Sequence, residues 1–351
     1  MAETVEPAEL LAVLPALIEL REPVFIAGPP GIGKSQIVRQ AAAKMGKDAK
    51  FWDVRAVTLD PVDVRGLPNI NAKDGLTHWL PPAFLPKKGE RGVLFLDELP
   101  QAPPAMQSAL LQLTLDRAIG DYVLPDGVSI IAAGNRPEDR SGSARLITAL
   151  ADRFVKLTLV PSFECWIDHV TGTGEVGIDI LSFLRWKPAA FHCPDPSKLA
   201  TPNPRNWVKA SKVLGRMGNV PRTALDAVLR GIIGSIAVEV LAFLDLHGTL
   251  PTPEKMLADP TTVELPSRLD ANWAISGSLI AYFDRPAVTT SQAMIQAFFT
   301  LLARFPAEVA IVSYSDVQRT RNGKEILAGI FKTAAGKAFA AQHKELFRGL
   351  I

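Results

Sequence analysis

Residues 28–35 read Gly-Pro-Pro-Gly-Ile-Gly-Lys-Ser and match the pattern G-x-x-x-x-G-K-[ST]. Glycines let such a loop curl so that several backbone N–H groups point at phosphate oxygens, and the helix that follows adds the positive end of its dipole. Lys34 would place a cation on the terminal phosphates, and the Ser35 hydroxyl can bind Mg²⁺. The residues expected around the phosphates are Pro30, Gly31, Ile32, Gly33, Lys34, Ser35 and Gln36.

The flanks of this loop support the phosphate-binding interpretation over a Gly/Pro turn that matches by chance. Residues 24–27 form a short apolar run, typical of a buried parallel strand, and residues 33–45 have the pattern of a helix. A phosphate loop needs this order of strand, loop and helix.

Two acids follow a second apolar run. Residues 93–96 are Val-Leu-Phe-Leu, and Asp97 and Glu98 come next. A carboxylate at the C-terminal edge of a parallel strand faces the ligand crevice of an α/β sheet. Asp97 would therefore hold Mg²⁺, and Glu98 would orient and polarise an attacking water as a general base. Two solvated acids at a strand end are the alternative.

Strand and helix patterns alternate over the first 160 residues or so, which predicts an α/β fold with a parallel sheet covered on both faces. Further strands are expected at 51–57, 129–133 and 155–159, and further helices at 7–20, 103–115 and 144–152. Beyond Pro161 the pattern is mostly helical, with helices expected at 205–217, 222–245, 289–304 and 323–347. The main boundary is expected between 161 and 200.

Composition limits the classes of partner and compartment. The chain has 38 basic and 36 acidic residues, so its net charge of +2 carries no global signature of nucleic-acid binding, although a local basic patch remains compatible with it. Two cysteines in 351 residues favour a reducing compartment. The acidic N-terminus is not a secretory signal, and the apolar run 232–244 is too short to span a bilayer. These features predict a cytoplasmic protein without a membrane segment.

Four stretches resemble the AAA+ ATPases, and more narrowly their MoxR-like branch. They are GPPGIGKS, VLFLDELPQAPPAMQSALLQ, IIAAGNRPED and ALADRF, in this order and spacing. The resemblance implies a P-loop NTPase αβα domain over residues 1–165, a linker and helical lid over 166–250, and a helical C-terminal extension over 251–351. It also implies ATP and Mg²⁺ as ligands and ATP hydrolysis as the reaction.

The resemblance assigns three further residues. Asn135 stands where the family has its sensor-1 residue, an amide that bonds both the γ-phosphate and the lytic water; a turn asparagine is the alternative. Arg153 resembles the arginine finger that completes a neighbouring subunit's site, and Arg145 is a second candidate for this role. Arg205, in Pro-Asn-Pro-Arg, resembles the sensor-2 arginine of the lid. For both arginines the alternative is an ordinary surface residue.

A finger that acts in trans implies a homo-oligomer, with a hexameric ring favoured. Two hairpins expected at 67–79 and 120–128 match the family's inserted loops, and Trp79 and Tyr122 are candidate partner contacts unless they simply pack under those loops. The implied function is ATP-driven remodelling or activation of a protein client, for which a von Willebrand factor A domain protein is one class. Nucleic acid is disfavoured as a partner. The alternatives are a nucleic-acid motor or loader and a nucleotide-gated scaffold.

Overall fold

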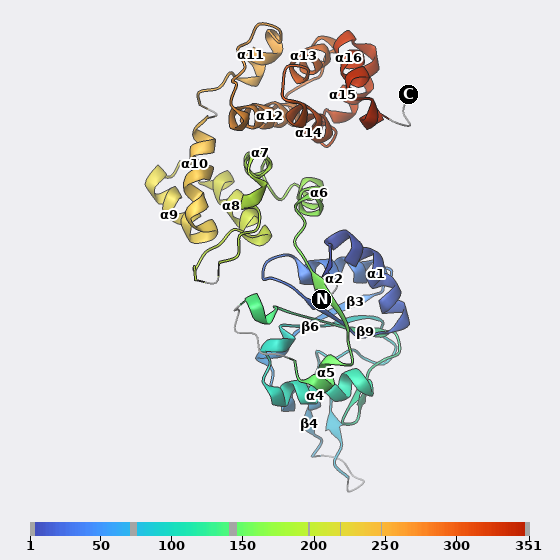
Figure 1. Cartoon of the computed structure of the whole chain (residues 1–351). Helices are drawn as coiled ribbons and strands as arrows, with labels where there is room; N and C mark the ends of the chain where they lie inside the picture. The colour runs from blue at the N-terminus through green and yellow to red at the C-terminus, as the bar shows by residue number, and fades with distance from the viewer. Residues whose placement is uncertain are drawn as a thin grey trace. The chain divides into compact units, whose positions relative to one another are not determined.

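The computed structural model describes residues 4–70, 76–139, 146–195, 197–217, 219–246 and 248–347. The chain divides into two compact units, Met1–Cys165 and Trp166–Ile351, and the division falls inside helix α6 (Phe163–Thr173). Figure 1 shows a first unit built around a sheet and a second unit built from helices.

The first unit contains a six-stranded sheet in which every neighbouring pair is parallel. Since parallel strands need crossover connections, helices cover both faces, as the alternating sequence pattern predicts. In spatial order the strands are β1 (Thr4–Val5), β10 (Val155–Leu159), β2 (Val24–Ala27), β9 (Val128–Gly134), β6 (Gly92–Asp97) and β3 (Lys50–Arg55). The α/β P-loop fold predicted from the sequence is therefore confirmed.

Alternate residues of the central strands belong to two separate hydrophobic cores, one on each face of the sheet. On one face, Ile26 and Phe95 pack with helices α1 (Pro7–Leu20) and α2 (Lys34–Ala43). On the other face, Leu94 and Leu96 pack with helix α4 (Pro104–Leu115) and the short helix α5 (Thr148–Ala151). A strand's side chains alternate between faces, so a continuous apolar run is what a sheet covered on both sides requires.

Two small hairpins extend the first unit. One pairs β4 (Leu67–Pro68) with β5 (Trp79–Leu80) and projects from the body of the unit in Figure 1; the other pairs β7 (Ala118–Ile119) with β8 (Tyr122–Val123). Residues 71–75, within the hairpin expected at 67–79, lie outside the described residues. Helix α3 (Pro61–Arg65) and three 3₁₀ turns complete the described unit: η1 (Ala56–Thr58), η2 (Leu99–Gln101) and η3 (Pro137–Asp139).

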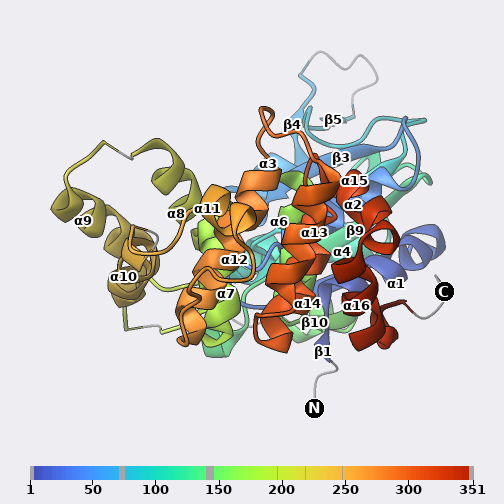
Figure 2. The same ribbon diagram turned by 90° about the horizontal axis from the view of Figure 1, so that it is seen from above.

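Helices alone make up the second unit over the residues that are described. Figure 2 shows α12, α13 and α14 alongside one another and α8, α9 and α10 as a neighbouring group. The bounds are α7 (Ile178–Trp186), α8 (Pro204–Arg216), α9 (Arg222–Ile233), α10 (Ala237–Leu246), α11 (Pro253–Ala258), α12 (Leu269–Phe283), α13 (Gln292–Leu302), α14 (Ala307–Val317), α15 (Gly323–Gly329) and α16 (Ala334–Gln342). The remaining 3₁₀ turns are η4 (Pro188–Ala190), η5 (Gly234–Ile236), η6 (Ile330–Lys332) and η7 (Lys344–Phe347).

Two long helices expected from the sequence are interrupted. The helix expected at 222–245 is divided between α9 and α10 because Gly234 has a φ of +70° and lies against the Ala200 carbonyl, 2.6 Å from where a Cβ would stand. The helix expected at 323–347 is divided into α15, η6, α16 and η7, with Thr333 capping α16. Both predictions of one continuous helix were wrong. The helices that were not predicted are α3, α6, α7, α11, α12 and α14.

One segment, Arg222–Leu246, is long and apolar enough to cross a membrane by length and composition, with a mean hydropathy of 2.0 over its best window. It reaches 25 residues only when α9, η5 and α10 are taken together. In this structure α10 packs against α7 and α12, and 33% of the most apolar window of the segment is buried.

Candidate nucleotide site

The phosphate loop connects β2 to α2 through two left-handed glycines. Gly31 has a φ of 80° and Gly33, which precedes the first residue of α2, a φ of 92°. Gly28 is needed for a different reason, because a Cβ there would stand 2.7 Å from the Leu159 carbonyl oxygen of β10. Residues with side chains rarely adopt such conformations or tolerate so close an approach. The loop is thus a compact backbone cradle at the N-terminus of a helix, where anions are favoured.

Lys34 is the first residue of α2, and its side chain turns back over the loop. Its Nζ donates to the carbonyl oxygens of Gly28 (2.7 Å) and Pro29 (2.9 Å) and to Oδ1 of Asn135 (2.9 Å). An ammonium group has three donors, which is enough to make these three contacts at once. The cation is therefore held at the mouth of the cradle and beside the end of β9.

Ser35 and Asp97 meet across the sheet edge. The Ser35 hydroxyl donates to Oδ2 of Asp97 over 3.1 Å, although 62 residues separate the two in the chain. A hydroxyl and a carboxylate are the oxygen ligands that Mg²⁺ prefers, and Mg²⁺ commonly uses one or two of them together with substrate phosphates. The donor set present therefore fits this ion.

Glu98 has a left-handed backbone, with φ 55° and ψ 32°, directly after β6. Its N–H donates to Oδ1 of Asp97 (3.0 Å), so the two acids hold each other's orientation. Left-handed non-glycine residues persist only where their surroundings hold them, and they concentrate at functional sites. The turn η2 that follows presses Pro100 against Gly134 of β9, where a Cβ would stand 2.3 Å from the proline ring.

Sheet order explains why these residues meet. β9 lies between β2 and β6, and all three strands are parallel, so their C-terminal ends open at one edge. Asn135 follows β9, Asp97 ends β6, and the phosphate loop follows β2. Pro30 and Gln36 are exposed at the same edge, while Ile32 is buried beneath the loop.

Arg153 lies away from this cluster in sequence, between α5 and β10. Its side chain is exposed and has no hydrogen-bond or ion-pair partner among the residues that the structure describes. Its neighbours are fixed: Leu150 is fully buried, and the Phe154 ring packs 6.2 Å from that of Phe25. Arg145, the second candidate finger, lies outside the described residues.

Arg205 belongs to the second unit, at the start of α8. Asn203 caps this helix by accepting from the Asn206 N–H, and Pro204 is its first residue. The Arg205 side chain is exposed. Its role toward a nucleotide in the first unit stays a prediction.

The aromatic residues proposed as partner contacts are partly packed. The Tyr122 hydroxyl donates to the Pro86 carbonyl (2.7 Å), and the Arg65 guanidinium lies over the Trp79 ring. The backbone N–H of Trp79 donates to the Asp121 carboxylate (2.9 Å), and this bond joins the two hairpins. These contacts favour a supporting role for both rings.

Two residues that the sequence argument did not single out also shape the site. Gly134 permits the close approach of Pro100. The sequence feature that could have pointed to it is its place just before Asn135. Gln107, buried on α4, bonds to Ala102 and to Ile147. The sequence feature that could have pointed to Gln107 is its position in the Pro-Pro-Ala-Met-Gln stretch, because helical periodicity alone gives no reason for an amide there.

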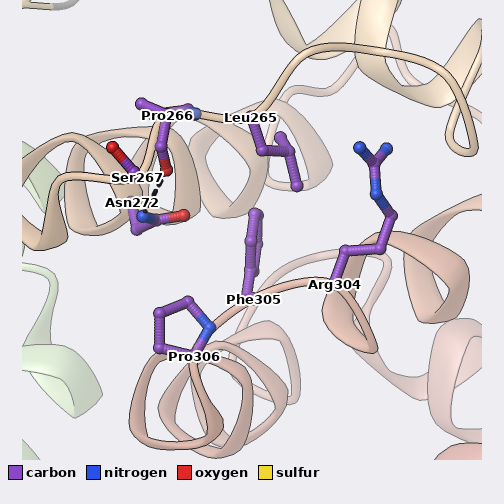
Figure 3. A pocket seen from close by; sticks show the side chains of 7 residues that line it. All are labelled: Leu265, Pro266, Ser267, Asn272, Arg304, Phe305 and Pro306. Atoms are coloured by element: carbon purple, nitrogen blue, oxygen red, sulfur yellow. Dashed lines mark hydrogen bonds between the residues drawn. The ribbon is translucent and has the colours of Figure 1, made fainter.

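A hollow of about 520 Å³ lies in the second unit, and Figure 3 shows the seven side chains that line it. The two side chains in its lining that carry N–H donors, Arg304 and Asn272, already donate to backbone carbonyls. Arg304 donates to the carbonyls of Pro260 and Val263, and Asn272 donates to those of Pro266 and Arg268. We therefore regard this hollow as part of the packing of α12 and α14.

Comparison with known proteins agrees with this geometry. The family model described as the AAA domain of the dynein-related subfamily matches residues 23–154. An uncharacterized protein YeaC of Bacillus subtilis is 30% identical over 151 residues, which cover 41% of this chain and 45% of that protein. A protein of Pseudomonas aeruginosa called ATP-dependent protease ATP-binding subunit-like protein AmiB is 32% identical over 139 residues, 36% of this chain and 35% of that one. The chain thus matches less than half the length of these relatives.

Solved structures are similar at low sequence identity. NtrX from Brucella abortus has a TM-score of 0.43 and 16% identity, covering 93% of this chain and 69% of that one. A RuvB mutant from Thermotoga maritima has a TM-score of 0.41 and 18% identity, covering 68% of each chain. The match at 23–154 spans β2, the phosphate loop, both acids, Asn135 and Arg153. Residues 23–154, within the first unit, thus match the AAA domain of the dynein-related subfamily.

Proposed function

We propose that the chain hydrolyses ATP at the edge formed by β2, β9 and β6. The observation that carries the proposal is the convergence of Lys34 with Asn135 and of Ser35 with Asp97. Each pair is within 3.1 Å and joins the loop after β2 to the end of another strand, β9 or β6. Lys34 and the loop N–H groups would hold the phosphates, and Ser35 and Asp97 would hold Mg²⁺. When bound, that ion neutralises charge on the phosphate oxygens.

Glu98 and Asn135 would act on the attacking water. Glu98 lies at the C-terminal end of β6 and has a left-handed backbone. Its carboxylate would accept a proton from water as a general base. Asn135 has an amide whose oxygen already faces Lys34, which leaves its nitrogen to donate to phosphate or orient the water. A site with three residues that bind (Lys34, Ser35 and Asp97) and two that act on water suits hydrolysis better than binding alone.

Arg153 would complete the site of a neighbouring subunit. An exposed guanidinium without a partner among the described residues, on a backbone anchored by Leu150 and Phe154, suits a contact made in trans. Such a residue offsets the charge that develops on the transferred phosphoryl group. The proposal therefore includes a homo-oligomer, with a hexameric ring favoured, and Arg205 as the lid residue that senses the γ-phosphate in cis.

The work done by hydrolysis would be remodelling or activation of a protein client, as in the MoxR-like branch. The two hairpins joined by Trp79 and Asp121 support this, because they carry exposed apolar side chains at Ile70 and Val123 that a client could cover. A von Willebrand factor A domain protein is one such client class. The free thiols of Cys165 and Cys193 suit the reducing cytoplasm.

The test is the rate of ATP hydrolysis per subunit as a function of protein concentration, with Mg²⁺ and no client. We expect a rate that rises and saturates, because each site needs Arg153 of a neighbour. Arg153→Ala should abolish hydrolysis and spare ATP binding, whereas Lys156→Ala, which removes a nearby exposed cation paired with Asp152, should change little. A measurable rate that does not change with concentration would make Arg153 structural. No hydrolysis at any concentration, with tight ATP binding, would favour a nucleotide-gated scaffold.

A second candidate function, a motor or loader on nucleic acid, is favoured by one observation in the second unit. No acidic residue occurs between Asp195 and Asp226, and helix α8 within that span presents four exposed cations on one narrow face, at Arg205, Lys209, Lys212 and Arg216. These positions are i, i+4, i+7 and i+11, which share a side of an α-helix. A cationic row of this kind suits a phosphate backbone despite the neutral balance of the whole chain.

This candidate is tested by adding DNA or RNA to the ATPase assay over a series of salt concentrations. Stimulation that weakens with salt, and that is lost in Lys209→Glu with Lys212→Glu, would establish it. Lys255→Glu, at another exposed lysine of the second unit, is the matched control. No binding and no stimulation would remove the candidate and leave the row for a protein partner.

A further inference from the structure

Gln107 is an amide buried in the apolar face of α4, where only 1% of the residue is exposed. Burying an amide without hydrogen bonds is costly, because its lost contacts with water are not replaced. Both ends of this one are bonded: Nε2 donates to the Ala102 carbonyl (3.1 Å), and Oε1 accepts from the Ile147 N–H (2.9 Å). One side chain therefore joins two backbone segments that are 45 residues apart in the chain, at 102 and 147.

The first segment presents Glu98. The Gln101 N–H donates to the Glu98 carbonyl (3.0 Å), and the Ala102 N–H closes the turn η2 on Leu99 (3.2 Å). Gln107 holds the far end of this turn through the Ala102 carbonyl. Because Glu98 is itself left-handed, a turn with less support would let it relax to a commoner conformation and move its carboxylate.

The second segment presents Arg153. Ile147 caps α5 at its N-terminus without a side-chain hydrogen bond of its own, and its N–H is taken up by Gln107. Helix α5 has four residues, so a shift at Ile147 passes directly to the residues after it. The Arg153 N–H in turn bonds to the Leu150 carbonyl (3.2 Å).

We propose that Gln107 is a positioning residue that fixes the Glu98 turn and the Arg153 segment to the same helix. Glu98 acts at the nucleotide site of its own subunit, and Arg153 acts at the site of the next subunit. The two hydrogen bonds of Gln107 therefore make both of these sites depend on one side chain. This inference rests on the proposed function. It adds a residue that touches neither nucleotide nor water and acts only through the two that do.

A purely structural amide would lower stability but would not affect both catalytic groups together. Gln107→Met separates the two cases, because methionine keeps a similar unbranched shape and loses both hydrogen bonds. Thr114→Val is the matched control: Thr114 is also buried on α4, but its hydroxyl bonds only within the helix, to Leu110 and Leu111. If Gln107→Met does not fold, Gln107→Asn keeps the amide but is too short to reach both partners.

The experiment measures ATP hydrolysis and nucleotide binding by the full chain at a temperature well below the unfolding midpoint of each variant. We expect Gln107→Met to lower kcat by on the order of 10²-fold, as small misplacements of catalytic groups do, with nucleotide affinity unchanged. Thr114→Val should keep kcat. A kcat for Gln107→Met close to wild type, or a loss matched by Thr114→Val, would overturn the proposal.

Mixed oligomers then show whether one side chain serves both groups. Glu98→Gln subunits still supply Arg153, and Arg153→Ala subunits still supply Glu98, so mixing these two should restore part of the activity. Gln107→Met subunits should restore activity with neither, because both of their groups are misplaced. Restoration in either mixture would overturn the coupling. Failure of the first mixture, which contains no Gln107 variant, would instead count against the finger in trans and thus against the proposed function.

Discussion

The two units of this chain position their important side chains in different ways. In the first unit, the groups at the candidate site stand at the ends of three adjacent parallel strands, so the backbone ladder of the sheet brings them together. In the second unit, the helices of the described residues are joined through side chains and not through a backbone ladder. The buried pair Arg185–Asp316 links α7 to α14 across 131 residues of sequence.

This difference predicts which unit tolerates change. A sheet fixes a site through many backbone hydrogen bonds, so a substitution at the strand edge should affect chemistry more than folding. A helical unit tied by a buried ion pair depends on a few side chains, so a substitution there should affect folding more than chemistry. Four predictions, from the largest expected effect to the smallest, test this contrast.

Glu98→Gln should have the largest effect, and this effect should be confined to the rate of hydrolysis. Removing a general base lowers kcat by roughly 10²–10⁴-fold, while the amide keeps the shape and the backbone of the turn. Steady-state ATP hydrolysis and nucleotide binding by fluorescence would check it. Loss of binding together with loss of kcat would show that Glu98 also shapes the phosphate site.

Arg185→Met should destabilise the second unit by about 3–5 kcal/mol, because Asp316 would keep a buried charge without its partner. Calorimetry should show the transition of the second unit shifted and that of the first unit unchanged. Arg319→Met is the control, since the Arg319–Asp168 pair is largely exposed and pairs of that kind contribute about 0–1 kcal/mol. Equal losses in the two variants would contradict the prediction.

Gly134→Ala should cost about 1–3 kcal/mol, because its Cβ would meet the rigid Pro100 ring at 2.3 Å. We expect kcat to fall as well, since Pro100 belongs to the turn after Glu98 and Gly134 precedes Asn135. In Gly215→Ala the new Cβ enters open space on α8, and stability should rise by about 0.5–1 kcal/mol. Chemical denaturation with an ATPase assay would compare them; no loss in Gly134→Ala would show that the turn can move.

Tyr122 and Tyr314 should give the smallest effect. Burial raises the pKa of Tyr122 to about 12 and also raises the pKa of Tyr314 above its ordinary value. The neutral phenol is thus favoured in the folded state, so its contribution is complete below pH 10 and is lost as pH rises from there through about 12. Because Tyr122 is partly exposed, solvent screening should keep its contribution to roughly 1 kcal/mol or less.

A phenolate absorbance titration would check this, with Tyr122→Phe as the variant. The variant should remove one late-titrating phenol and flatten the alkaline fall in stability. If the wild-type Tyr122 titrates near its ordinary pKa, the hairpin that carries it opens more freely in solution than its bond to Pro86 indicates.

Much of the first unit was predictable because its information is local. The phosphate loop, the two acids and Asn135 each follow an apolar run that is long enough to be a strand, and parallel strands place such residues at one edge. Gln107 was not predictable, because its two partners lie at 102 and 147 and no periodicity in the sequence relates them.

The second unit was predicted less well for a related reason. Helix α12 is buried on almost every side, so its sequence shows no apolar stripe and gives little helical signal. The expected helix at 222–245 had the right composition, but Gly234 ends α9 where the backbone meets Ala200. These outcomes depend on neighbours distant in sequence.

The sequence by itself determined the αβα architecture, the phosphate loop and the acids that serve it, because strand patterning and loop chemistry act over a few residues. Only the tertiary structure decided that Lys34 reaches Asn135, that Glu98 is left-handed, that Gln107 spans two segments and that Arg185 meets Asp316. Each of these depends on packing between elements that the chain brings together from far apart, and a side chain's partner there is set by the fold as a whole.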